Sequence, residues 1–220
     1  MTRVPNVSTS LGRSAATLEA AAAKLGERTV AVVSDIATQA DLDALKALVE
    51  QQDERLDAVF ANAGICEKTG WRYHQGCVLH DVRHQRQRCV LHGSDAPALD
   101  ERRRGDRADG LHLLQQLSFY NASKAAVRSF IRTWANELKG RKIRTNVLSP
   151  GFTRTRLMDN GLKMDEAQIE ALRQHVAQIV PLGYMADPSE IASAALLLAS
   201  ADAQYVNGVE LMVDGGLSQI

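Results

Sequence analysis

Short apolar runs alternate with amphipathic helical segments along most of this chain, and this alternation restricts the fold more than any other feature of the sequence. We predict strands at residues 29–33, 56–60, 142–148 and 209–213, and helices at residues 14–25, 41–52, 123–139 and 189–200. The strand segments are almost continuously apolar, which is typical of strands buried in a parallel sheet. Strands that alternate with helices in this way predict one α/β domain over residues 1–220.

Composition and charge exclude several classes of protein. The 220 residues are enough for one domain with a full core. The 26 basic and 26 acidic residues cancel, so charge gives no reason to expect a nucleic-acid or membrane partner. No apolar run reaches the roughly 18 residues that span a bilayer, and residues 1–11 lack the apolar core of a signal peptide. Three cysteines do not form a disulfide framework, so we expect a cytoplasmic protein.

Polar and glycine residues follow three of the predicted strands. Asp35 follows the first, Asn62-Ala63-Gly64 the second, and Pro150-Gly151 the third. In open parallel sheets, ligands bind beyond the carboxyl ends of the strands, so this shared placement indicates a binding site. Each residue also has an ordinary interpretation, since Asp35 could cap a helix, Gly64 could form a plain turn, and Pro150-Gly151 could simply end a strand.

Tyr120 and Lys124 are four residues apart, so on a helix they point the same way, one turn from each other. A free phenol has a pKa near 10 and is a poor base at neutral pH. A cation within a few ångströms lowers the pKa of the phenol toward neutrality, so the pair suits moving a proton on or off an alcohol or carbonyl oxygen. Taken alone, the pair is more often a surface tyrosine with an unrelated lysine. The rest of the sequence favours the chemical interpretation.

These pieces form a joint pattern. The stretches that carry it are Val32-Val33-Ser34-Asp35, Phe60-Ala61-Asn62-Ala63-Gly64, Tyr120-Asn121-Ala122-Ser123-Lys124, Arg144-Thr145-Asn146-Val147-Leu148-Ser149-Pro150-Gly151-Phe152-Thr153, Pro181-Leu182-Gly183, Asp187-Pro188-Ser189-Glu190-Ile191-Ala192 and Asn207-Gly208-Val209-Glu210-Leu211-Met212-Val213-Asp214-Gly215-Gly216. In this order and spacing they resemble the short-chain dehydrogenase/reductase family, over about residues 12–65 and 117–220.

The resemblance implies a Rossmann-like doubly wound parallel sheet and an NAD(P)-dependent oxidoreductase, similar to the 3-oxoacyl reductases, that moves hydride between nicotinamide and an alcohol or ketone. Tyr120 would be the general acid/base, and Lys124 would lower its pKa and hold the nicotinamide ribose. The other implied cofactor residues are Asp35 at the adenine edge, Asn62, Ala63 and Gly64 along the adenosine, and Pro150, Gly151 and Thr153 beside the nicotinamide. Arg13 resembles the family's contact to the 2′-phosphate, so NADP is favoured over NAD. The family also implies a homo-oligomer, a dimer or tetramer.

The chain departs from the family at two places. The family opens with a strand and a glycine-rich turn that binds the pyrophosphate. Residues 1–11 contain no glycine, so we expect the first βα unit to be missing and the sheet to be incomplete. Residues 67–116 are the second departure, since they are basic and histidine-rich where the family has a buried helix and strand. Arg107 stands where the active-site serine is expected, and Ser118 is too near Tyr120 to replace it.

A shift of reading frame would explain the second departure. With chosen codons for residues 83–115, reading one nucleotide later gives an apolar sequence similar to the family's, and the frame would return near Leu117. Three alternatives stay open: a solvated insertion, a basic arm for nucleic acid, and a metal site. The residues with metal-ligand spacing are His74, Cys77, His80, His84, Cys89 and His92.

The sequence therefore supports two functions. The first is the oxidoreductase, with a small alcohol or ketone as substrate and no metal. The second is a catalytically inactive remnant that retains only a partial fold or self-association, through the Tyr–Lys helix and the final helix and strand. Residues 153–180 are either an apolar substrate lid or a helix pair packed on the body of the protein.

Overall fold

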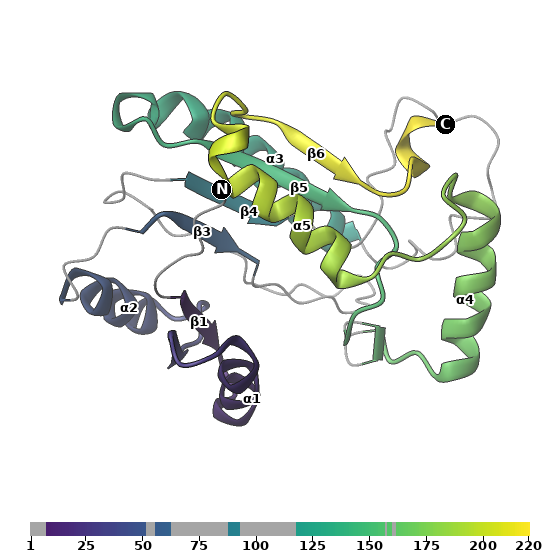
Figure 1. Ribbon diagram of the computed structural model, residues 1–220, viewed down its shortest axis with the longest axis horizontal. Helices are drawn as coiled ribbons and strands as arrows, with labels where there is room; N and C mark the ends of the chain where they lie inside the picture. The colour runs from purple at the N-terminus through teal and green to yellow at the C-terminus, as the bar shows by residue number, and fades with distance from the viewer. Residues whose placement is uncertain (1–7, 52–55, 63–87, 93–117, 157, 160–161) are drawn as a thin grey trace. The chain divides into compact units, whose positions relative to one another are not determined.

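The computed structural model describes residues 8–51, 56–62, 88–92, 118–156, 158–159 and 162–220 (Figure 1). The chain divides into two compact units. The first consists of residues 1–57 with 76–85, and the second of residues 58–75 with 86–220. Each unit has its own parallel sheet.

The first unit is a βαβα segment. Strand β1 (Ser8–Gly12) pairs in parallel with β2 (Thr29–Val33), and α1 (Ala15–Leu25) connects them. Ser14 caps the start of α1, and Gly26 ends the helix at a φ of 92°, a backbone conformation that glycine adopts without strain. Helix α2 (Gln39–Gln51) follows. The helices and β2 agree with the sequence prediction to within two residues, whereas β1 was not predicted.

The second unit contains a four-stranded parallel sheet in the order β3-β4-β5-β6. Its strands are β3 (Ala58–Ala61), β4 (Arg88–His92), β5 (Thr145–Pro150) and β6 (Glu210–Val213). A doubly wound sheet has the order 3-2-1-4-5-6. Among the described residues, no strand pairs with both the two-stranded and the four-stranded sheet, so one continuous sheet in this order is not completed.

Helices cover both faces of the four-stranded sheet. Ile131 of α3 (Ser118–Glu137) packs against Val147 on one face. On the other face, Leu148 packs against Ile191 and Leu198 of α5 (Pro188–Ala199). Val147 and Leu148 are 1% and 0% exposed, because successive strand residues point to opposite faces and both faces are covered. Helix α4 (Glu166–Ile179) builds a separate apolar cluster of Met158, Ile169, Leu172, Val176 and Val180.

The start of β5 is tied to the end of α5 by a buried arginine. The Arg144 guanidinium donates to the carbonyl oxygens of Leu198 at 2.7 Å, Val206 at 3.0 Å and Ser200 at 3.3 Å. The Leu198 and Ser200 carbonyls lie at the carboxyl end of α5, where backbone oxygens lack helical partners and a cation is favourable, and Val206 lies beyond the short helix Ala201–Ala203. The Arg144 position of the family pattern is thus explained by the packing of the fold.

Two predicted burials are wrong. The sequence predicts that residues 29–33 and 56–60 are buried strands, but Val33 of β2 is 59% exposed and Phe60 of β3 is 46% exposed. Among the described residues, β2 pairs only with β1, and β3 pairs only with β4. Because side chains project from the faces of a sheet, these exposed fractions show that the described residues do not fully cover the faces at Val33 and Phe60, and apolar composition cannot replace that cover.

Strand β4 is the part of residues 67–116 that the structure describes, and no strand was predicted there. It pairs in parallel with both β3 and β5, with Leu91 level with Ala61 on one side and Val147 on the other. The reading-frame hypothesis stays a prediction. Most residues of the metal-site alternative lie outside the described ranges, and the described residues contain no group of three or more potential metal ligands. Within the same ranges, no helix is long and apolar enough to cross a membrane.

Candidate active site

Helix α3 runs antiparallel to the strands of the second unit. Near its carboxyl end, Ala135 lies beside Gly208, whose amide donates to the Thr145 carbonyl at the start of β5. Seven residues earlier, Arg128 forms an ion pair with Glu210 at 3.4 Å, and Glu210 is level with Val147. Residues earlier in α3 therefore lie progressively closer to the carboxyl end of β5.

This direction brings Lys124 toward the end of β5. From Ile131, which packs on Val147, seven helical residues back to Lys124 span about 10 Å. From Val147, three strand residues forward to Pro150 also span about 10 Å. Lys124 is half-buried and is three and seven residues from Val127 and Ile131, so it lies on the sheet-facing side of α3. Tyr120 belongs to the same helix, one turn earlier, and its side chain lies outside the described residues.

Asn62 and the Pro150-Gly151 pair lie at the same edge of the four-stranded sheet. Asn62 is exposed and directly follows β3, and its amide donates to the Phe60 carbonyl at 3.0 Å. Pro150 is the last residue of β5, and both Pro150 and Gly151 are buried. Because β3 and β5 both run parallel to β4, their carboxyl ends share one edge. Ala63 and Gly64 lie outside the described residues.

The turn after β5 is stabilised by a hydrogen bond within the turn itself. Thr153 is buried, and its hydroxyl donates to the Gly151 carbonyl at 3.2 Å. The Thr155 hydroxyl is also buried, but it has no hydrogen-bond partner among the described residues. An unpartnered buried hydroxyl is uncommon and can be satisfied by a bound ligand. Sequence reasoning named Thr153 and not Thr155, because no local sequence signal marks a buried hydroxyl without a partner.

Arg13 and Asp35 belong to the first unit. Arg13 is exposed and lies directly after β1, between the strand and the start of α1. Asp35 follows β2 and Ser34, and its carboxylate accepts the Ala37 amide at 3.0 Å, while its own amide donates to the Asp41 carboxylate at 2.6 Å. Asp35 thus stabilises the turn before α2 and does not cap the helix, which begins only at Gln39; its role as a ligand contact stays a prediction.

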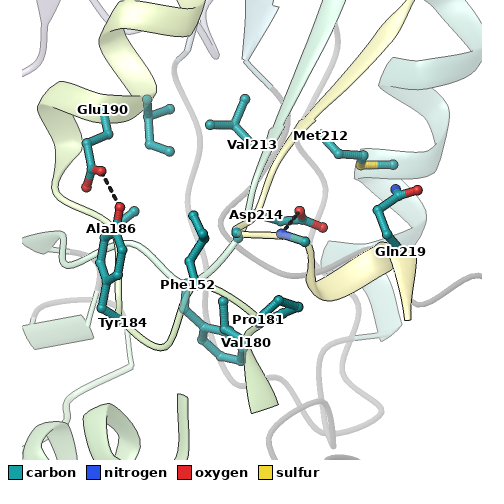
Figure 2. Close-up of a pocket in the computed structure, with 15 residues that line it drawn as sticks. Phe152, Val180, Pro181, Tyr184, Ala186, Glu190, Met212, Val213, Asp214 and Gln219 are labelled. Atoms are coloured by element: carbon teal, nitrogen blue, oxygen red, sulfur yellow. Dashed lines mark hydrogen bonds between the residues drawn. The ribbon is translucent and has the colours of Figure 1, made fainter. Parts of the chain in front are cut away.

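A pocket of about 600 Å³ opens beside the turn after β5 (Figure 2). Apolar groups dominate its wall, including Phe152, Val180, Pro181, Leu182, Ile191 and Met212. Figure 2 shows Tyr184 and Glu190 on one side, and Asp214 and Gln219 on the other. The Tyr184 hydroxyl donates to Glu190 at 2.8 Å, and this hydrogen bond raises the pKa of Tyr184 above its ordinary value. The volume is in the range of small-molecule sites.

The segment between β5 and α5 forms an apolar cluster of its own. Thr153 forms a parallel bridge with Ala186, and the apolar side of α4 is used within its own cluster with Met158 and Val180. Met158, Ile169 and Leu172, which the sequence allowed as part of a lid, are buried in that cluster. The described residues of this segment contain one α-helix, α4, and both interpretations of residues 153–180, the substrate lid and the packed helix pair, stay predictions.

The second unit has three features that bear on the binding of a nicotinamide dinucleotide. It has a half-buried lysine near the level of the last residue of β5, an exposed asparagine after β3, and an unpartnered buried hydroxyl at Thr155. Gly151 leaves no open space for a ligand on its side-chain side, since a Cβ atom there would collide with Asp214 of the same chain. The residues present are compatible with a bound nicotinamide dinucleotide, and Gly151 is needed for packing whether or not one binds.

Comparison with known proteins places the chain in a family. A family model described as enoyl-(acyl carrier protein) reductase matches residues 108–218, about half of the chain. The oxidoreductase asL5 of Sarocladium schorii is 34% identical over 217 residues, which cover 95% of this chain and 84% of that one. The 3-oxoacyl-(acyl carrier protein) reductase FabG of Thermotoga maritima is 32% identical over 193 residues, which cover 80% of this chain and 73% of that one.

Solved structures show the same fold. A gluconate 5-dehydrogenase from Burkholderia cenocepacia, in complex with NADP and tartrate, matches with a TM-score of 0.72 at 23% identity, covering 96% of this chain and 85% of that chain. Levodione reductase matches with a TM-score of 0.74 at 22% identity, covering 96% and 87%. The structural matches show the Rossmann fold, and together with the matches in sequence they lead to one conclusion: the chain belongs to the short-chain dehydrogenase/reductase family.

Proposed function

We propose that this chain is an NAD(P)-dependent oxidoreductase that acts on an alcohol or ketone, with Tyr120 as the general acid/base. The observation that supports the proposal most directly is the direction of α3, which brings Lys124 near the level of Pro150, at the sheet edge that Asn62 also occupies. A bound nicotinamide dinucleotide would supply or accept the hydride at the substrate carbon. Tyr120 would give a proton to the substrate oxygen or take one from it, and the Lys124 ammonium would favour the phenolate.

The remaining residues would hold the cofactor. They are Arg13 and Asp35 for the adenosine end, Asn62, Ala63 and Gly64 along the adenosine, Lys124 for the nicotinamide ribose, and Pro150, Gly151 and Thr153 beside the nicotinamide. NADP is favoured because Arg13 is an exposed cation after β1, and an arginine binds a phosphate with charge-assisted hydrogen bonds. The finer assignment to 3-oxoacyl reduction is supported by the similarity to FabG.

Titration of the purified chain with NADPH and NADH, followed by nicotinamide fluorescence, tests cofactor binding. We expect saturable binding and a preference for NADPH. Arg13→Ala should weaken NADPH binding by about tenfold and leave NADH unchanged, since one phosphate contact is lost. Arg28→Ala, at an exposed position before β2, is the matched control and should change neither. Absence of saturable binding of both cofactors would overturn the proposal.

A substrate panel tests the chemical step. Ketones, cyclic diketones and 3-oxoacyl thioesters would be offered with NADPH, and turnover followed by loss of nicotinamide absorbance. Tyr120→Phe should lower turnover by about 10²–10⁴ with little change in NADPH binding, because only the proton donor is removed. Tyr205→Phe removes the same hydroxyl from a fully exposed tyrosine and should leave turnover unchanged. Equal effects of the two substitutions would exclude the assigned role of Tyr120.

A second function, the inactive remnant, is supported by the exposed apolar side chains Val33 and Phe60 on strands that pair on one side only among the described residues. In this case the chain would bind neither cofactor but still self-associate. Leu196, Leu197 and Tyr205 are exposed on and after α5, which is where the family implies association into a dimer or tetramer. Light scattering of the purified chain measures this. The nucleotide sequence for residues 83–115 tests the reading-frame hypothesis separately.

A further inference from the structure

The turn after β5 is fixed by two segments that are distant in the sequence. On one side, the Gly151 amide donates to the Val213 carbonyl of β6 at 2.9 Å. On the other, the Ala186 amide donates to the Phe152 carbonyl at 2.9 Å, and the Arg154 amide donates to the Ala186 carbonyl at 3.1 Å. The position of residues 151–154 is therefore set by the residues that follow α4 and by those that end β6.

Gly151 and Asp214 approach more closely than any side chain at position 151 would permit. A Cβ atom on Gly151 would lie 2.6 Å from the Asp214 Cα and 2.8 Å from its Cβ. Backbone atoms cannot move aside as the end of a flexible side chain can, so this contact fixes the turn against Asp214. The glycine of the Pro150-Gly151 pair thus makes room for the chain's own C-terminal segment.

The Asp214 carboxylate organises that C-terminal segment. One oxygen accepts the Gly216 amide and the other accepts the Ser218 amide, each at 2.9 Å. Burial of the carboxyl opposes ionisation, but the hydrogen bonds from Ser218 and Gly216 outweigh it and lower the pKa of Asp214 below the ordinary value. Asp214 is therefore a carboxylate with both oxygens engaged at neutral pH, and it closes the turn that leads into the final short helix, Leu217–Gln219.

This closed turn also holds the segment that pairs with Phe152. Gly215 and Gly216 have φ values of +66° and +90°, which favour glycine. The Leu182 amide donates to the Gly215 carbonyl at 3.2 Å, and a Cβ on Gly215 would lie 2.6 Å from Val180. Figure 2 shows Asp214 with Val180, Pro181 and Phe152 around the same pocket. The contacts continue from Asp214 through residues 180–186 back to Phe152.

We propose that Asp214 is a positioning residue for the turn at residues 150–154. It acts by direct backbone contact with Gly151, and through the Gly215-Gly216 turn on the segment that pairs with Phe152. It does not touch the reacting atoms. These contacts do not depend on any assignment of function. The expected effect of Asp214 on binding of the nicotinamide end of the cofactor, in contrast, rests on the proposed function.

Hydrogen exchange of the unliganded protein, measured by mass spectrometry, tests the positioning itself. Asp214→Ala removes two hydrogen bonds, so peptides covering residues 150–156 should exchange about tenfold faster or more. Asp214→Asn keeps one acceptor oxygen, so the exchange rate of these peptides should fall between the rates of the unsubstituted protein and of Asp214→Ala. Asp202→Ala, at an exposed aspartate in the second unit, is the matched control and should leave these peptides unchanged. Faster exchange confined to residues 214–220 would overturn the proposal.

Binding of two ligands then tests whether loss of the Asp214 carboxylate weakens binding of the nicotinamide end of the cofactor. NADPH contains the nicotinamide, whereas 2′-phospho-ADP-ribose lacks it and retains the adenosine end. Asp214→Ala should weaken NADPH binding by about tenfold and leave 2′-phospho-ADP-ribose within about twofold. Equal weakening of both ligands would indicate a general loss of structure and would exclude the positioning role. If the unsubstituted chain binds neither ligand, the proposed function fails, and the exchange experiment still decides whether Asp214 positions the turn.

Discussion

Strands β2 and β5 show that the burial of a strand depends on its neighbours more than on its composition. All but the first residue of Thr29–Val33 are aliphatic, whereas Thr145–Pro150 contains threonine, asparagine and serine. Nevertheless every residue of β5 is buried, and no residue of β2 is. Apolar content alone would predict that β2 is more buried than β5, which is the reverse of the burial that is observed.

The difference follows from position within each sheet. Strand β5 has β4 and β6 on its two edges and α3 and α5 on its two faces. Among the described residues, β2 has β1 on one edge. The polar side chains of β5 are satisfied at these borders, for example Asn146, which donates to the Val206 carbonyl at 3.1 Å and accepts the Val209 amide at 3.1 Å. A buried polar group that is hydrogen-bonded costs little.

The largest expected effect tests this contrast with one substitution in each unit. Leu148→Ala in β5 should destabilise the second unit by about 2–5 kcal/mol, because it leaves a cavity between β5 and α5. Leu11→Ala in β1 removes the same atoms from a side chain that is 39% exposed, and should cost about 1 kcal/mol or less. Urea unfolding, with hydrogen exchange to assign the effect to a unit, measures both. Equal losses would contradict the contrast.

The next effect concerns the buried arginine that anchors β5. Arg144→Met should destabilise the second unit by about 2–4 kcal/mol, because the carbonyls of Leu198, Val206 and Ser200 lose a charged donor. Arg173→Met is the matched control, since Arg173 is exposed and bonds only to Glu170 one turn earlier among the contacts described, so it should change stability by less than about 0.5 kcal/mol. Urea midpoints that shift equally for both variants would refute the structural role of Arg144.

Local signals in the sequence predicted most elements of the fold. Asp187-Pro188 predicted the start of α5, and the structure has a capping box there between Asp187 and Glu190. Strand β1 was missed because Ser8–Gly12 is mostly polar, and β4 because charged residues flank a short apolar run in Arg88–His92. Both strands are defined by pairing with distant partners, which a local pattern cannot report.

The candidate site was predictable only in part. The sequence placed Asn62 and Pro150 after strands and paired Tyr120 with Lys124 at helical spacing, and α3 does contain both positions of the pair. To predict that Lys124 lies near the level of Pro150, one would need the direction and register of α3 on β5, which the sequence does not give. The packing of Gly151 against Asp214 was also invisible, because the two residues are far apart in sequence and meet only through the pairing of β5 with β6.

A third prediction separates a crowded glycine of the second unit from an open one. Gly151→Ala should destabilise by about 1–3 kcal/mol, because its Cβ would lie 2.6 Å from the Asp214 Cα and the backbone would have to shift. Gly140→Ala has no neighbour within 4 Å of its Cβ, so it should be neutral or stabilise slightly, by about 0.5 kcal/mol, through the unfolded state. Urea unfolding measures both, and a Gly151→Ala variant as stable as the parent would show that the contact relaxes without cost.

The smallest expected effect is a difference in acid sensitivity between helix starts in the two units. Hydrogen bonds from Ser189 lower the pKa of Asp187 at the start of α5 below its ordinary value of 3.8, whereas Ser14, which has no charge, caps α1. Because the pKa is lower in the folded state, the stabilisation by Asp187 is complete above the ordinary value and is lost as pH falls through the folded one. Exchange at residues 187–192, corrected for intrinsic rates, should rise in acid more than at residues 14–19. Asp187→Asn keeps a neutral cap, so it should abolish this extra rise, and a rise that persists in that variant would exclude Asp187 as its cause.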